Sequence, residues 1–398
     1  MLPTWWLLPA THALQPPPPT ALATPSPRAA LVLEGLDAVL RHGKCVEKTV
    51  SRTLRAGSRS GVLSCNEQRA AVAESLFGVS MLRARLAHLA MATNLEPKPA
   101  ALLSLFLTHE TPQRVDAAVL ARELPCDALG LPDAARRRVR ALDVDRDVAW
   151  PDEPGARLAV QYSLPPRLVS GWAVELQSWD EAELLAAACN RAGPVTLRAN
   201  TALGGRAALR AALARDAPAA LLQSSDGELS PWAVRLHGGR PSWGGSLWAL
   251  RCWGEGAFEA QDEGSQCVAA ATEAAEGETV LDLCAGNGGK TLALAAMVGP
   301  SGRVLAYDVQ QSRLQQLGKA AERARVAARV ESLPELDQRR LHGLCDVVLV
   351  DAPCSSSGVL RRHPGLRWGG AWAEGAAWDG AKGVWLDAAA GGGGAAAG

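Results

Sequence analysis

TVLDLCAGNGGKT (residues 279–291) begins as an apolar run that ends in Asp282 and continues into a glycine-rich turn. An apolar run bounded by turn residues predicts a buried strand, and the Leu/Ala-rich stretch after Lys290 predicts a helix. Glycines let the backbone come close to a ligand, and the N–H groups at a helix start point toward it. The segment therefore predicts a strand–turn–helix unit that binds a nucleotide-like cofactor.

Two further segments have the same design. VVLVDAPCSSSG (residues 347–358) predicts a buried parallel strand whose carboxyl end brings Asp351 and Cys354 to a crevice above the sheet. RVLAYD (residues 303–308) predicts a strand ending in Asp308, about 20 residues past the turn, where an acid can accept ribose hydroxyls. Asp308 could instead cap the next helix, and Cys284 could simply be a small buried residue.

The glycine turn excludes two cofactor classes. A triphosphate-binding loop needs glycine where Cys284 stands, and a dinucleotide fingerprint needs a third glycine or alanine where Thr291 stands. S-adenosylmethionine carries an adenosine and a cation but no phosphate, so it needs glycines and well-placed carboxylates. The spacing of these residues favours S-adenosylmethionine.

These motifs, in this order, resemble the RNA cytosine-C5 methyltransferases of the NOL1/NOP2/Sun group. The likeness includes Arg361-Arg362-His363-Pro364 and Trp368 after the third segment, and extends upstream to residues 258–266, 195–201 and 163–168. It therefore implies a Rossmann-like methyltransferase domain that acts on RNA, expected to be ribosomal RNA.

The resemblance also implies roles for single residues. S-adenosylmethionine would be held by Cys284, Ala285, Gly286, Asn287, Gly288, Gly289, Lys290, Asp308 and Asp351. Asp351 would also contact the target base, Cys354 would help a covalent cysteine–cytosine adduct to break down, and Arg198, Arg361 and Arg362 would contact RNA.

The attacking cysteine of the family lies in a later Thr-Cys-Ser segment, whereas no cysteine follows Cys354 here. Residues 369–398 are mostly glycine and alanine, which predicts a disordered tail and a sheet that lacks its last strands. The family's third-strand acid falls near Ser332, with Asp337 a loose substitute. Two alternatives stay open: a catalytically inactive RNA-binding pseudoenzyme acting in ribosome assembly, and a helical RNA-binding protein with a degenerate C-terminal half.

Pattern divides the chain into six parts. Aliphatic residues recur at helical spacing over 29–41, 68–89 and 101–107, and Ser75–Val79 is similar to a helix of NusB-like domains. We expect a targeting leader (1–33), an all-helical NusB-like domain (34–142), a linker (143–154), a small α/β RNA-binding module (155–257), the incomplete Rossmann-like domain (258–368) and the tail (369–398).

Formal net charge is zero, with 41 basic and 41 acidic residues, so RNA binding must rest on local patches. Candidates are the arginine-rich run at 136–140 and Arg361-Arg362, although the second could equally be a solvated face. Nine cysteines at scattered spacings predict free thiols and no metal site.

Apolar runs of about 20 residues, the length that spans a bilayer, do not occur, so we expect no membrane insertion. We expect a monomer. The acid-poor N-terminus, with Arg28 as the one basic residue before Glu34, is typical of a plastid or mitochondrial leader. Otherwise the expected location is cytoplasmic or nucleolar.

Overall fold

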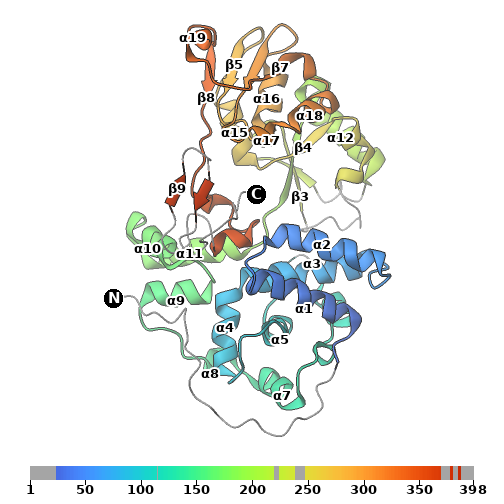
Figure 1. Cartoon of the computed structure of the whole chain (residues 1–398), viewed down its shortest axis with the longest axis vertical. Helices are drawn as coiled ribbons and strands as arrows, with labels where there is room; N and C mark the ends of the chain where they lie inside the picture. Colours follow the sequence, from blue (N-terminus) through green and yellow to red (C-terminus); the bar gives the residue numbers. More distant parts are fainter. Residues whose placement is uncertain are drawn as a thin grey trace.

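The computed structural model of the chain describes residues 24–113, 115–218, 224–237 and 247–368, and the backbone of 377–379 and 384–386. Figure 1 shows the N-terminal helices at one end of the molecule and a parallel sheet at the other. Among the described residues, no helix is long and apolar enough to cross a membrane.

The N-terminal region is all-helical, as predicted. Its elements are α1 (Pro27–Leu40), α2 (Val46–Arg59), α3 (Asn66–Met81), α4 (Arg83–Ala92), α5 (Pro99–His109), α6 (Ala117–Glu123), η1 (Cys126–Leu129), α7 (Asp133–Ala141) and α8 (Val144–Asp147). The Ser26 hydroxyl caps α1, and Ala29 and Val32 are fully buried in the shared core. The helical domain therefore begins before residue 34, and the NusB likeness stays a prediction.

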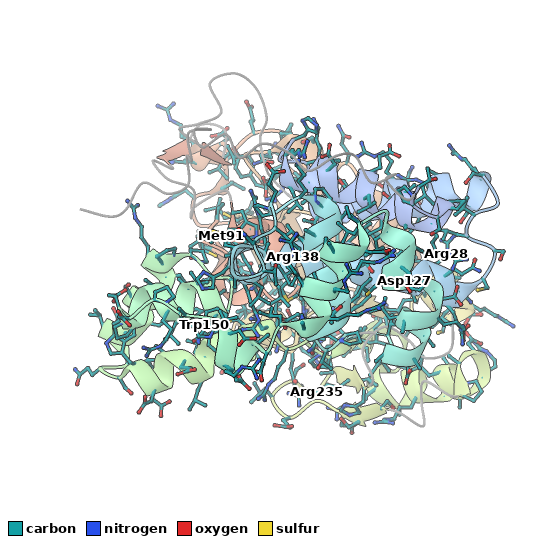
Figure 2. All side chains as sticks on the ribbon, turned by 90° about the horizontal axis from the view of Figure 1, so that it is seen from below. Arg28, Met91, Asp127, Arg138, Trp150 and Arg235 are labelled. Atoms are coloured by element: carbon teal, nitrogen blue, oxygen red, sulfur yellow. The ribbon has the colours of Figure 1, made fainter. Side chains whose placement is uncertain are left out.

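The predicted linker is packed against the helical domain. Val148 is buried, and the Trp150 ring stacks on His88 of α4 with 5.0 Å between ring centroids. The Arg85 guanidinium lies 5.3 Å from the centroid of the same ring. Figure 2 shows Trp150 where α4 and α8 meet the helices that follow. Stacking of this kind ties the two parts together.

The predicted α/β module consists of two parts. Three helices come first: α9 (Pro154–Gln161), α10 (Pro166–Glu175) and α11 (Trp179–Asn190). An antiparallel sheet with strand order β2-β3-β1-β4 follows. Its elements are β1 (Val195–Ala199), η2 (Thr201–Leu203), α12 (Gly205–Asp216), β2 (Ser224–Asp226), β3 (Ala233–Leu236), η3 (Leu247–Ala249), α14 (Arg251–Gly254) and β4 (Phe258–Ala260). Because β4 pairs with β1, this sheet extends past the expected boundary at residue 257.

The C-terminal region contains a parallel sheet with strand order β7-β6-β5-β8. Its elements are α15 (Glu263–Ala270), β5 (Thr279–Asp282), α16 (Gly289–Met297), β6 (Arg303–Ala306), α17 (Gln311–Leu314), α18 (Leu317–Arg323), η4 (Ala327–Arg329), β7 (Val330–Ser332), α19 (Gln338–Leu341), β8 (Val347–Leu349), η5 (Ser357–Val359) and η6 (Pro364–Arg367). Strand order reverses between β5 and β8, and ligands of such sheets bind beyond the carboxyl ends of the strands at that point.

The prediction that β8 is buried on both faces is wrong. Among the described residues β8 has one neighbouring strand, β5, and the side chains of Val348 and Val350 are 53% and 57% exposed. A parallel strand loses its burial when nothing pairs with its outer edge or covers its faces. The expected incompleteness of the sheet is visible here as an exposed apolar edge.

The predicted tail lies mostly outside the described residues. Two short strands within it, β9 (Ala377–Asp379) and β10 (Val384–Leu386), pair antiparallel as a hairpin. The expectation that this stretch lacks any strand is therefore wrong. The hairpin forms a sheet of its own and does not extend the parallel sheet.

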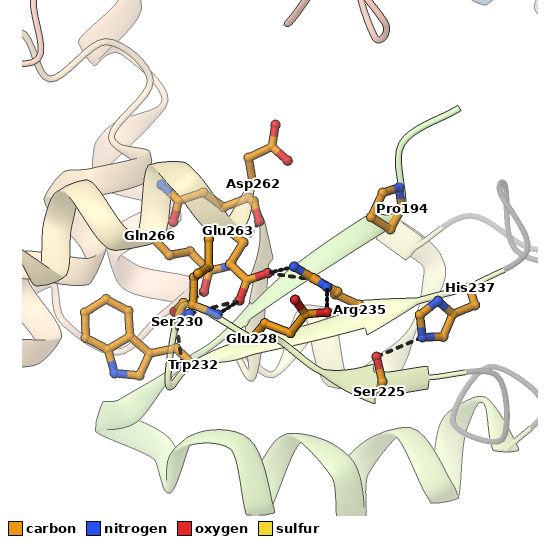
Figure 3. A network of polar contacts seen from close by, with 12 residues as sticks. Pro194, Ser225, Glu228, Ser230, Trp232, Arg235, His237, Asp262, Glu263 and Gln266 are labelled. Atoms are coloured by element: carbon orange, nitrogen blue, oxygen red, sulfur yellow. Dashed lines mark hydrogen bonds and ion pairs between the residues drawn. The ribbon is translucent and has the colours of Figure 1, made fainter. Parts of the chain in front are cut away.

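A polar network joins the antiparallel sheet to the start of α15 (Figure 3). One carboxylate oxygen of Glu263 accepts hydrogen bonds from the backbone N–H groups of Leu229 (2.6 Å) and Ser230 (2.9 Å), while the other pairs with Arg235. The Ser230 hydroxyl donates to the Gln266 side chain over 2.8 Å. The network fixes α15, which also packs on α16, and so positions the glycine turn.

Candidate cofactor and active site

The glycine turn between β5 and α16 is tied to the end of the neighbouring strand β6. The backbone N–H of Ala285 donates to the Tyr307 carbonyl, and that of Gly286 to a carboxylate oxygen of Asp308, both over 2.9 Å. Gly286 and Gly288 have φ of 56° and 87°, a region that favours glycine. A Cβ on Gly288 would lie 2.3 Å from the side chain of Leu317. Both glycines are therefore needed for the shape of the turn.

Asp308 lies at the predicted place beside the turn and is buried. Its second carboxylate oxygen accepts a hydrogen bond from the Gln310 backbone N–H over 2.7 Å, just before α17. One carboxylate oxygen of Asp308 therefore caps the start of α17, as the alternative interpretation expects. The other accepts a hydrogen bond from the glycine turn. Each carboxylate oxygen has further lone pairs for a ligand hydroxyl, so ribose binding stays a prediction.

Asp282 is a candidate that the motif-based prediction left out. It ends β5, is 1% exposed, and accepts a hydrogen bond from the Thr291 hydroxyl over 2.7 Å. Its other oxygen is buried without a hydrogen-bonded partner among the described residues. Burial raises the pKa of Asp282, although the Thr291 hydrogen bond and the Lys290 charge oppose that shift. Its signal in the sequence was the one used for Asp308 and Asp351, an acid at the end of an apolar strand.

Lys290, in the first turn of α16, forms an ion pair with Asp351, which directly follows β8. The lysine side chain is 16% exposed and the aspartate side chain 44% exposed, so the pair is partly open to solvent beyond the carboxyl ends of β5 and β8. The structure therefore brings together two residues that are far apart in sequence and were both predicted to belong to the site.

The two candidate cysteines have different surroundings. Cys284 is half-buried, and burial, together with the charges of Asp308, Asp282 and Asp351, raises the pKa of its thiol. A protonated thiol is a poor nucleophile, which supports the packing interpretation of Cys284. Cys354 is exposed on the loop after β8, where its sulfur accepts the Ser356 N–H over 3.4 Å.

The residues around the turn fit S-adenosylmethionine. Gly286 has open space where a Cβ would stand, Asp308 lies just after the second strand, and the orphaned oxygen of Asp282 offers an acceptor for a cation or a hydroxyl. Counting correctly placed Ser332 at the end of the third strand, β7, whereas Asp337 caps α19 through two backbone N–H groups. Over the described ranges no group of His, Cys, Asp and Glu could hold a metal ion.

The three predicted RNA-binding arginines have contacts within the protein. Arg198 is buried, donates to the Gln261 side chain over 2.7 Å and also binds the Gly289 carbonyl. Burial lowers its pKa to about 10, so it remains charged at neutral pH. The prediction that Arg198 contacts RNA is therefore corrected. The buried Arg198 side chain instead supports the glycine turn through the Gly289 carbonyl.

Arg361 and Arg362 lie in the segment that follows the active-site loop. Arg362 pairs with Asp262 and donates to the Pro194 carbonyl over 3.2 Å, and Arg361 lies against Gly193. Both are partly exposed, so contact with RNA stays a prediction for them.

Arg367 joins this segment to the N-terminal half and was missed by sequence reasoning. It is 1% exposed and donates to the side chain of Asn190 (2.7 Å) and to carbonyls of four residues. These are Met81, Tyr162, Ser163 and Cys189. Burial lowers its pKa to about 10, and the acceptors around it stabilise the charge. Only the packing of distant helices could reveal this role.

Comparisons with known proteins agree with this geometry. Residues 269–374 match the sequence model of the family described as 16S rRNA methyltransferase RsmB/F. The chain is similar to the probable ribosomal RNA small subunit methyltransferase B of Bacillus subtilis (strain 168), with 30% identity over 222 residues, 54% of this chain and 47% of that protein. It is similar to the protein of the same name from Synechocystis sp., with 32% identity over 240 residues, 58% of this chain and 50% of that protein.

The chain thus spans about half the length of these curated relatives. Among solved structures, the crystal structure of the protein PH0851 superimposes with a TM-score of 0.62 at 19% identity, covering 86% of this chain and 78% of that one. That likeness shows a shared fold. The glycine turn and the strand order agree with these matches, and residues 269–374 are similar to the RsmB/F family of 16S rRNA methyltransferases.

Proposed function

We propose that this chain methylates carbon 5 of a cytidine in ribosomal RNA. The observation that supports the proposal most is the Lys290–Asp351 ion pair, which lies where strand order reverses and next to a glycine turn that fits the cofactor. Carbon 5 of cytosine is a poor nucleophile. A thiolate must first add at carbon 6, and a carboxylic acid at the ring nitrogen offsets the charge that develops.

In this proposal, Asp351 is the carboxyl group that faces the ring nitrogen, and Lys290 holds it in place. Cys354, three residues further along the same loop, helps the covalent adduct to break down. When bound, S-adenosylmethionine supplies the methyl group. Gly286 leaves space for it at the turn, Gly288 lets the turn pack on Leu317, and Asp308 accepts hydrogen bonds from its ribose.

One step of this mechanism, the attack of a thiolate on carbon 6, has no residue assigned to it. Family resemblance places the attacking thiol in a Thr-Cys-Ser segment, and the printed sequence has no cysteine after Cys354. A chain that binds the cofactor and RNA without transferring a methyl group is the alternative that the test below distinguishes. Both candidate functions predict binding of the cofactor and of RNA, but only the first predicts methyl transfer.

The test is methyl transfer by the purified chain. It would be incubated with in vitro transcribed 16S rRNA and S-adenosylmethionine labelled in the methyl group, and the digested nucleosides analysed by mass spectrometry. We expect 5-methylcytidine, with loss of product in Asp351→Asn. Cys345→Ser, which changes a cysteine at the amino end of β8, should leave the product unchanged.

Label on another base or atom would contradict C5 specificity. Tight binding of cofactor and RNA with no labelled nucleoside would favour the binding-only function. Label at another position would leave the description of the fold and the cofactor site unchanged. Binding without methyl transfer would agree with the lack of an attacking thiol in this sequence.

Two further expectations remain proposals. We propose a monomer, which light scattering of the purified chain would test. We also propose that the acid-poor N-terminus directs the chain to a plastid or mitochondrion. A fluorescent fusion that loses organelle localisation when residues 1–23 are removed would support this, and unchanged localisation would contradict it.

A further inference from the structure

Helix α2 carries four cationic side chains on one face, which we call the α2 stripe. Successive members are four, three and four residues apart, so on a helix of 3.6 residues per turn they form one line. The stripe consists of Lys48, Arg52, Arg55 and Arg59, all exposed. The opposite face packs into the helical domain through Val46, Thr49, Val50, Thr53 and Gly57. The alignment thus leaves all four charges in solvent.

No acidic side chain among the described residues forms an ion pair with any member of the stripe. Glu47, the one acidic residue of α2, instead accepts hydrogen bonds from the His363 ring (3.1 Å) and the Cys45 thiol (3.0 Å). Four uncompensated cations in line make a local positive field that suits a polyanion.

The arginine-rich run of α7 shows the contrast. Its sequence is denser in charge, yet Arg136 pairs with Asp133 and lies 3.6 Å from Asp127, and Arg140 lies 2.7 Å from the same Asp127. In the view from below, Asp127 lies beside the helix that carries Arg138 (Figure 2). Two of the four arginines of α7 are thus paired with acids, whereas no member of the α2 stripe is paired with an acid among the described residues.

The position of the stripe connects it to the proposed active site. The His363–Glu47 contact joins the N-terminal end of α2 to the segment that follows Cys354 and carries Arg361 and Arg362. From there the stripe extends about 16 Å at 1.5 Å per residue. That length corresponds to about five phosphates at ~3.4 Å of helix axis each. Lys48, next to Glu47 in sequence, is the member of the stripe nearest to this contact along α2.

We propose that the α2 stripe binds the phosphate backbone of the substrate RNA and guides it away from the active-site crevice. The inference rests on the proposed function, because that function supplies the RNA. Phosphate contacts set register and orientation without reading sequence, and mobile lysine and arginine side chains suit that task. The stripe therefore contributes affinity for RNA, while base selection belongs to the crevice.

The test compares two variants of the full chain with the same change in charge. The stripe variant is Lys48→Gln/Arg52→Gln/Arg55→Gln/Arg59→Gln, and the matched control is Arg136→Gln/Arg137→Gln/Arg138→Gln/Arg140→Gln in α7. Binding to in vitro transcribed 16S rRNA would be measured across a series of salt concentrations. Circular dichroism and thermal unfolding would confirm that both variants fold.

For the stripe variant we expect affinity to fall more than tenfold near 0.1 M salt. The slope of log affinity against log salt should shrink by about 3, since each lost phosphate contact removes roughly 0.7–0.9. The α7 control should keep wild-type affinity and slope. Both variants should bind S-adenosylmethionine as the wild type does.

If the stripe variant binds RNA as tightly as the wild type does, the inference is overturned, while the proposed function is unaffected. An equal loss in the α7 control would also overturn it, because binding would then follow total charge alone. A wild-type chain that binds S-adenosylmethionine but no RNA would overturn both this inference and the RNA substrate of the proposed function.

Discussion

At the scale of single residues, the acids that end the parallel strands differ in what their oxygens contact. Asp308 has a backbone N–H on each oxygen, Asp351 has the Lys290 ammonium, and Asp282 has one buried oxygen with no hydrogen bond. A buried acceptor without a partner costs about 1–3 kcal/mol. Costs of this kind concentrate at functional sites, so Asp282 is a candidate ligand of the cofactor.

Replacing Asp282 by asparagine tests this role. Because burial raises the pKa of Asp282 in the folded chain, the folded state binds more protons than the unfolded state just above the usual carboxyl pKa. Wild-type stability therefore falls as pH rises through that window, and Asp282→Asn should lose this fall. At pH 7 the variant should unfold at an equal or higher temperature than wild type.

The same variant should bind S-adenosylmethionine at least tenfold more weakly, because a neutral amide replaces a charged acceptor. Calorimetric titration and thermal unfolding between pH 4 and 8 give the two readouts. Thr291→Val is the matched control: it removes the hydrogen bond from the Thr291 hydroxyl to the Asp282 carboxylate and should destabilise the chain. Unchanged affinity in Asp282→Asn would exclude Asp282 from the cofactor site.

At the scale of elements, neighbouring strands of one sheet differ in burial. Val280 of β5 is fully buried between β6 and β8, whereas Val348 of β8 is half exposed. Both are valines in apolar runs, so sequence patterning treats them alike. The difference comes from strand order, which places β5 inside the sheet and β8 at its edge.

Two valine substitutions should therefore have unequal effects. We expect Val280→Ala to destabilise the catalytic region by about 1–3 kcal/mol, because it removes buried methyl groups and leaves a cavity. Val348→Thr should change stability by less than about 0.5 kcal/mol, since the residue is already half exposed. Urea unfolding measures both changes. A similar loss of stability in the two variants would mean that β8 is covered in solution.

At the scale of the whole molecule, the chain after Cys354 turns back to the N-terminal half. Leu360 is fully buried among residues of α9, α10 and α11, and the Trp368 ring nitrogen donates to the Ser80 carbonyl over 3.1 Å. Arg367 lies between these two contacts with acceptors from three separate helical regions. This segment links the catalytic loop to the helical domain and to the α2 stripe.

Arg367→Met should weaken that link. Removing the guanidinium leaves buried carbonyls without donors, and breaking a buried charged network costs about 3–5 kcal/mol. We expect a lower unfolding temperature and faster chymotrypsin cleavage near Leu366 and Trp368. Arg362→Met is the control, because it loses one partly exposed ion pair worth at most about 1 kcal/mol. Equal cleavage rates in the two variants would contradict the linking role of Arg367.

The sequence by itself determined the local units. Apolar runs that end in Asp282, Asp308 and Asp351, the glycine turn and the helical periodicity near the N-terminus each depend on neighbouring residues, and all appear in the structure. Motif spacing also predicted the cofactor class and the family that residues 269–374 match, since spacing reflects local geometry.

Tertiary structure decided what depends on distant partners. It buried Arg198 under the turn, made Arg367 a link between helical regions, and exposed β8 because strand order left its outer edge unpaired among the described residues. It also paired two of the four arginines of α7 with acids, while the arginines of α2 form no ion pair within the described part of the chain. Burial and charge compensation depend on which residues are in contact in the folded chain, and a local sequence pattern does not specify those contacts.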